Sequence, residues 1–326
     1  MSAKSELKII LNSQLGKGKL LSKWLPRKGP IAVALTKFMD MSPKMYRKTI
    51  VGLTNVVESQ MCAKDWDKIN FSHVPSVASG RYQKAFGRNA KDLYSAYIAE
   101  LKKPQAERAA GVKINAGAVY PYDVVRNVAT GNAAVADEQW KALPNYVGNA
   151  KIFPMVDVSG SMGSLGNRYH SGAPMPIEVA VSLGLYLSDK NTGPFKDMFL
   201  TFSERPEIIT VKGSLSQKMH QMSTSAWQMN TNLVAAFDKL LDVAVRGNVP
   251  ESEMPEVLLI LSDMQFDNAM MRGNPFDDRA SQMIRRKYND AGYNLPKIVF
   301  WNLQVGYGNV PVKFDERGTA HVSGYS

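Results

Sequence analysis

Short apolar runs alternate with amphipathic stretches throughout the second half of the chain. The runs are rich in Val, Ile, Leu and Phe and are bounded by polar or glycine-rich segments, which is typical of strands buried on both faces. The stretches between them repeat apolar residues at spacings of three and four, which predicts helices. We therefore expect an α/β fold with a mostly parallel sheet covered by helices on both faces. The predicted strands are 152–156, 198–202, 207–212, 257–261 and 297–303, and the predicted helices are 177–187, 232–245 and 276–288.

The first half of the chain shows helical periodicity. An apolar stripe runs over residues 46–61 behind Ser42-Pro43, a pair that is typical of a helix start, and a second stripe runs over residues 92–101. No alternation typical of strands occurs before about residue 150. We therefore expect an all-helical region.

Between these halves, residues 104–150 are rich in glycine and proline, so a linker and packing region is expected there. It includes one predicted helix over residues 119–128. The sequence thus predicts a helical region with its linker at residues 1–148 and an α/β domain at residues 149–326.

Polar side chains follow two of the predicted strands. Ligands of open parallel sheets bind beyond the carboxyl ends of the strands, where Asp157 and Asp263 stand. Ser159 and Ser161 follow Asp157 on one tight turn, and such hard oxygen ligands suit Mg²⁺, Mn²⁺ or Ca²⁺. The segment matches neither the dinucleotide-binding pattern, the phosphate-binding loop nor the G-x-S-x-G nucleophile motif. The alternative is that the serines only cap the next helix.

Asp157-x-Ser159-x-Ser161 after an apolar strand resembles the metal-ion-dependent adhesion site (MIDAS) of von Willebrand factor A domains. That family also has a threonine at the start of a later helix and an aspartate at the end of a later strand, and Thr231 and Asp263 match these positions. The resemblance implies that these five residues hold Mg²⁺ (or Mn²⁺ or Ca²⁺), directly or through water. It also implies that the open position of the metal takes an acidic group from a protein partner.

The excess positive charge of the chain lies in its first half. The 326 residues include 40 Lys and Arg against 29 Asp and Glu, a formal net charge of +11. Residues 1–150 hold 23 against 11, a net of +12, whereas residues 151–326 hold 17 against 18, a net of −1. This asymmetry indicates two parts with different partners.

Composition narrows the class of protein. The chain is 44% hydrophobic and 21% charged, which is ordinary for a globular protein. No apolar run reaches the length of about 18 residues that a membrane helix needs, and no secretory signal peptide is evident. The single cysteine, Cys62, excludes an internal disulfide and a cysteine-based zinc site, and its apolar surroundings predict that it is buried. A cytoplasmic location without membrane attachment is expected.

Four motifs stand out in the basic half: Lys23-Trp24-Leu25-Pro26, Lys44-x-Tyr46-Arg47, Asn70 to Ser76, and Arg81-Tyr82-x-x-Ala85-Phe86. They look like those of a family of uncharacterised proteins that couple a helical region to a C-terminal von Willebrand A domain. This layout is similar to that of the TROVE proteins, which include the Ro ribonucleoproteins. The resemblance implies binding of small structured RNA on a basic helical surface. The alternative is a solvated basic face over an aromatic core.

The Ro-like resemblance has two departures. The helical half is too short for a closed ring of helical repeats. Residues 320–326 resemble the last strand of the family, and the closing helix that normally follows is not in the sequence. We therefore expect either that another element, a partner chain or a second copy covers this sheet face, or that the chain is a shortened product. The expected RNA contacts are Lys17, Lys19, Lys23, Arg27, Lys28, Lys44, Arg47, Lys48, Arg81, Lys84 and Arg88.

The sequence therefore predicts a non-enzymatic binding protein in which the metal site captures an acidic protein group and the helical half binds RNA. The alternative is an assembly protein whose metal bridges subunits. A metal-dependent phosphate-ester hydrolase is disfavoured, because the sequence names no general base beside the metal ligands.

Overall fold

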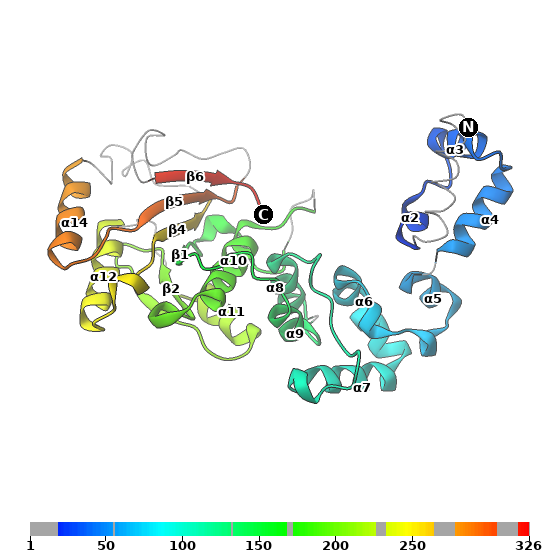
Figure 1. Ribbon diagram of the computed structural model, residues 1–326, viewed down its shortest axis with the longest axis horizontal. Helices are drawn as coiled ribbons and strands as arrows, with labels where there is room; N and C mark the ends of the chain where they lie inside the picture. The colour runs from blue at the N-terminus through cyan, green and yellow to red at the C-terminus, as the bar shows by residue number, and fades with distance from the viewer. Residues whose placement is uncertain are drawn as a thin grey trace. The chain divides into compact units, whose positions relative to one another are not determined.

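The computed structural model describes residues 19–54, 56–131, 133–167, 172–225, 233–263, 278–304 and 319–325 (Figure 1). The chain divides into two compact units. The helical unit comprises Met1–Val74 with Lys84–Glu100, and the α/β unit comprises Pro75–Gln83 with Leu101–Ser326.

The described part of the helical unit contains helices and no strand, as predicted. Tyr46 and Ile50 are buried against Ala32 and Met39, and the Tyr46 hydroxyl donates to the carbonyl of Pro26 at 3.1 Å. The elements of the helical unit are α2 (Lys19–Trp24), α3 (Pro30–Phe38), α4 (Pro43–Leu53), α5 (Val57–Ala63), η1 (Trp66–Lys68) and η2 (Phe71–His73), with parts of α6 (Ser76–Asn89) and α7 (Lys91–Lys102).

One predicted helix is in fact two. The apolar stripe over residues 46–61 is interrupted at Thr54, which ends α4 in an extended conformation (φ −80°, ψ 91°). Helix α5 then begins at Val57. Val57 is a buried residue of α5, so the apolar stripe continues in the sequence across the break between the two helices.

A six-stranded sheet forms the centre of the α/β unit, in the order β3-β2-β1-β4-β5-β6. All neighbouring pairs are parallel except β2 with β3, which are antiparallel. The strands are β1 (Ile152–Val156), β2 (Met198–Thr201), β3 (Ile208–Thr210), β4 (Val257–Ser262), β5 (Lys297–Asn302) and β6 (Thr319–Ser323).

Helices cover both faces of this sheet, which confirms the predicted fold class (Figure 1). On one face, α10 (Pro176–Lys190) and α11 (Leu215–Ser223) share a core with alternate residues of β1 and β4. On the other face, α12 (Leu233–Arg246) and α14 (Asp278–Asp290) pack against the remaining residues of these strands. The central strands are buried on both sides, so they are apolar without alternation.

Two helices that precede the sheet belong to the α/β unit by their packing. Val124 and Val125 of α8 (Pro121–Ala129) are fully buried, and Trp140 of α9 (Ala136–Lys141) packs edge-on against Tyr186 of α10 at 6.4 Å. Helix α8 confirms the predicted helix over residues 119–128, whereas α9 was not predicted. The predicted domain boundary at residues 148/149 stays a prediction.

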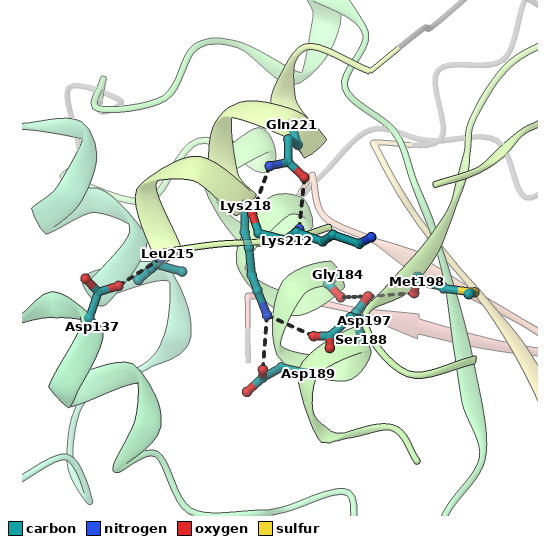
Figure 2. Close-up of polar contacts among 10 residues, drawn as sticks. All are labelled: Asp137, Gly184, Ser188, Asp189, Asp197, Met198, Lys212, Leu215, Lys218 and Gln221. Atoms are coloured by element: carbon teal, nitrogen blue, oxygen red, sulfur yellow. Dashed lines mark hydrogen bonds and ion pairs between the residues drawn. The ribbon is translucent and has the colours of Figure 1, made fainter. Parts of the chain in front are cut away.

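Polar contacts fix α11 over α10 (Figure 2). The Lys218 ammonium contacts the carboxylates of Asp197 at 2.8 Å and Asp189 at 3.3 Å. At the first residue of α11, the backbone N–H of Leu215 donates to Asp137 of α9 at 2.8 Å. Helix α9 is thus joined to α11 by a hydrogen bond as well as by the shared core.

Candidate metal site at the carboxyl edge of the sheet

Two aspartates meet where β1 and β4 end. Val156 of β1 lies opposite Leu261 of β4, and the Asp157 backbone N–H donates to the Leu261 carbonyl at 3.0 Å. This register places Asp157 beside the segment Ser262-Asp263. Asp157 is 2% exposed and Asp263 is 1% exposed, so two carboxylates are buried at one edge of the sheet.

The Asp157 carboxylate is held in place by hydrogen bonds to both of its oxygens. Oδ1 accepts from the backbone N–H of Ser159 at 2.8 Å, and Oδ2 accepts from the Ser262 hydroxyl at 2.7 Å. Ser262 had no predicted role. Ser262 contacts Asp157 only because β1 lies beside β4 in the sheet, and the sequence around Ser262 does not encode that pairing.

The two serine hydroxyls converge on the turn that follows Asp157. Ser159 Oγ and Ser161 Oγ lie 3.1 Å apart, with Ser159 half-buried and Ser161 exposed. The turn is a short 3₁₀ helix, η4 (Gly160–Met162), anchored by the fully buried Met162. It ends at Gly163, whose φ of 86° lies in the left-handed region that favours glycine.

The serines do not cap the next long helix. Helix α10 begins at Pro176 and its N-cap is Met175, whereas Ser159 is the N-cap of η4 and makes no side-chain capping hydrogen bond. The alternative that Ser159 and Ser161 serve only as caps is therefore wrong. Their hydroxyls face each other across the turn instead.

Burial dominates the electrostatics of the site. It raises the pKa of Asp157 above the ordinary value of 3.8, the hydrogen bonds from Ser262 and Ser159 oppose the rise, and the nearby charge of Asp263 adds to it. A cation bound here would oppose this rise by favouring the ionised form of Asp157.

The donor atoms fit a hard divalent metal. Asp157, Ser159, Ser161 and Asp263 offer oxygens only, which is the ligand type that Mg²⁺, Mn²⁺ and Ca²⁺ prefer. Thr231, the fifth predicted ligand, lies outside the described residues. Within the ranges that the structure describes, no cluster of three or more His, Cys, Asp or Glu side chains is suited to holding a metal.

The predicted RNA-contacting residues occupy mostly exposed positions. Lys44, Arg47 and Lys48 recur at spacings of three and four on α4, and all three are exposed. Lys23 differs, because its ammonium pairs with Glu58 at 2.8 Å. The other exposed positions are Arg27, Lys28, Arg81, Lys84 and Arg88, while Lys17 and the side chain of Lys19 lie outside the described residues.

Two protein-family models match this chain. A family model described as a domain of unknown function (DUF7788) matches residues 152–326, more than half of the chain. The chain belongs to the DUF7788 family. A second model, a domain of unknown function (DUF2828), matches residues 34–150, so the region matched to it includes α8 and α9. The DUF7788 region itself contains all six described strands and the candidate metal ligands.

Two individual proteins are similar over nearly the whole chain. Uncharacterized protein L728 of Acanthamoeba polyphaga mimivirus is 28% identical over 352 aligned residues, which cover 97% of this chain and 58% of that protein. The chain thus spans little more than half the length of this relative. The crystal structure of the Ro (RSR) protein of Deinococcus radiodurans matches with a TM-score of 0.51 and 14% identity, over 96% of this chain and 71% of that one. This likeness is one of fold.

Among the described helices, none is both long and apolar enough to cross a bilayer. The predicted cytoplasmic location stays a prediction.

Proposed function

We propose that this protein is a non-enzymatic, metal-dependent binding protein whose MIDAS-like site holds Mg²⁺ and captures an acidic group of a protein partner. The observation that carries the proposal is the convergence of oxygen donors at the ends of β1 and β4. Asp157 and Asp263 are buried side by side in the sheet edge, and the Ser159 and Ser161 hydroxyls lie 3.1 Å apart on the turn above Asp157.

The same geometry favours binding over catalysis. Both oxygens of the Asp157 carboxylate accept hydrogen bonds, so this group is held as a ligand rather than poised to take a proton from a substrate. A cation held by two carboxylates and neutral hydroxyls keeps a strong attraction for a further oxygen anion. An acidic side chain of a partner supplies that anion.

Calorimetric titration of Mg²⁺ and Mn²⁺ into the full chain tests the metal site. Wild type should bind one ion, and Asp157→Asn should bind at least about tenfold more weakly, because it removes one negative charge from the site. Asn can keep both hydrogen bonds, since the Ser262 hydroxyl is able to accept as well as donate. Equal binding by the two proteins would exclude this site.

We further propose that the basic helices bind structured RNA. Two observations support this: the fold resembles that of a Ro protein, and neither α4 nor α6 contains an acidic residue. Lys44, Arg47 and Lys48 lie on the exposed side of α4, where phosphates can reach them. Filter binding across a salt series should show higher affinity than an equally charged control protein. Equal affinity would overturn this part of the proposal.

An assembly role for the metal makes a different prediction. If the metal bridges subunits, chelation should lower the mass of the particle in solution, whereas capture of a separate partner leaves the mass unchanged. Light scattering after gel filtration, with and without chelator, separates the two functions.

A further inference from the structure

A buried ion pair lies behind the turn that carries the candidate metal ligands. Arg126 of α8 contacts Glu178 of α10 through two parallel hydrogen bonds, Nε to Oε1 at 2.9 Å and Nη2 to Oε2. The side chain of Arg126 is 9% exposed and that of Glu178 is completely buried. The pair joins two helices through residues that are 52 positions apart in sequence, and Arg126 lies outside the region that matches DUF7788.

Glu178 also holds the start of α10, next to the metal-site turn. Its Oε2 accepts a hydrogen bond from the backbone N–H of Met175 at 3.2 Å. The Met175 side chain in turn packs against Gly163, since a Cβ added to that glycine would lie 3.2 Å from the Met175 sulfur. Gly163 directly follows η4, which contains Ser161. A continuous series of contacts therefore runs from Arg126 to the turn.

Helix α8 touches the same loop at a second point. A Cβ added to Gly166 would lie 3.6 Å from the Cβ of Ala129, the last residue of α8. The segment after η4 is thus packed against the end of α8 at Gly166 and against the start of α10 at Gly163. Both supporting helices are fixed to each other by the Arg126–Glu178 pair.

We infer that Arg126 is a positioning residue for the proposed metal site, acting through Glu178 and Met175 on the turn that holds Ser159 and Ser161. Buried ion pairs are poor stabilisers compared with apolar residues of the same size, but their fixed geometry orients the groups around them. Residues behind the ligands of a metal site commonly set its affinity in this way. The inference rests on the proposed function, and it assigns part of the metal site to the region matched by DUF2828.

Three variants of the full chain test this role. Glu178→Gln breaks the ion pair and keeps an acceptor for the Met175 N–H, and Arg126→Met/Glu178→Met replaces the pair by apolar residues that are expected to preserve folding. Glu138→Gln is the control, because Glu138 forms a partly buried ion pair with Arg108 at 2.8 Å and has no contact with the turn among those described. Two quantities are measured: Mg²⁺ affinity by calorimetry, and hydrogen exchange of the amides of residues 159–163 in chelator.

Glu178→Gln and the double variant should each bind Mg²⁺ about 10- to 100-fold more weakly than wild type, and their 159–163 amides should exchange faster even without metal. Glu138→Gln should change neither quantity. Wild-type affinity and exchange in the folded double variant, or an equal loss in Glu138→Gln, would overturn the positioning role. If wild type itself binds no Mg²⁺, the proposed function fails. Faster exchange of the 159–163 amides in Glu178→Gln would then still support the positioning of the turn. Unchanged exchange of these amides would overturn the positioning role as well.

Discussion

Gly184→Ala perturbs a close contact between helix α10 and strand β1 of the sheet. A Cβ on Gly184 of α10 would lie 2.5 Å from Cγ2 of Val156 and 3.1 Å from the Met222 sulfur. Carbon atoms in contact lie about 3.5–4.0 Å apart, so α10 or β1 must move by on the order of 1 Å. Overpacking costs about 1–3 kcal/mol, and the stiff, fully buried Val156 places the cost at the upper end of that range. The higher helix propensity of alanine offsets about 1 kcal/mol, which leaves a net destabilisation of about 2 kcal/mol.

Hydrogen exchange of the β1 segment measures this change directly. A loss of about 2 kcal/mol corresponds to roughly 30-fold faster exchange of amides that open with the core of the α/β unit. Gly117→Ala is the control in the same unit, since Gly117 is exposed and an added Cβ meets no atom within 4 Å. It should be neutral or stabilising by up to about 1 kcal/mol. If Gly184→Ala exchanged as slowly as Gly117→Ala, the close packing of α10 on β1 would be wrong.

Three further predictions concern the helices and the site. Gly87→Ala in α6 should stabilise the helical unit by about 0.5–1 kcal/mol in urea denaturation, because Gly87 is exposed and its surroundings are open; a lower stability would contradict that exposure. Burial raises the pKa of Asp157 in the folded protein above the ordinary value of 3.8. The stability that the protonated Asp157 carboxyl contributes is therefore present below pH 3.8 and is lost as the pH rises through the folded-state pKa. In chelator at pH 7, Asp157→Asn should therefore melt higher than wild type, with the difference vanishing towards pH 3.8, and a lower melting temperature at pH 7 would refute this. Lys44→Ala should lower the slope of log RNA affinity against log salt by about 1. Lys23→Ala should leave it nearly unchanged, because Lys23 is paired with Glu58, and equal slopes for the two variants would argue against α4 as the RNA surface.

Features encoded by local pattern could be predicted from the sequence. The buried strands appear as uninterrupted apolar runs, and the helix at Pro121 begins with a residue whose fixed φ suits the first helical turn. The strand-end aspartates could be found because parallel strands expose their carboxyl ends at one edge. The serine pair was found through its spacing from Asp157.

Features that depend on contacts across the chain could not be predicted. The six-residue α9 is too short to show a periodic stripe, and its burial comes from α8 and α10. The partnership of Arg126 with Glu178 joins positions 52 residues apart, which no local pattern encodes. Cys62 was predicted to be buried and is exposed. Its neighbours are apolar in sequence, but α5 buries only Val57, so the rest of this short helix faces outward or is only partly covered.

The proposed metal site is tested most directly by Mn²⁺ binding to wild type and to Ser159→Ala/Ser161→Ala, measured by electron paramagnetic resonance of the free ion. These hydroxyls bond to each other at 3.1 Å, and Ser159 makes no capping hydrogen bond, so the double substitution should leave the fold intact. Wild type should bind one Mn²⁺ per chain, with Mg²⁺ competing for it, and the double variant should bind at least about tenfold more weakly. Equal Mn²⁺ binding by the two folded proteins would contradict a metal site built from Asp157, Ser159 and Ser161.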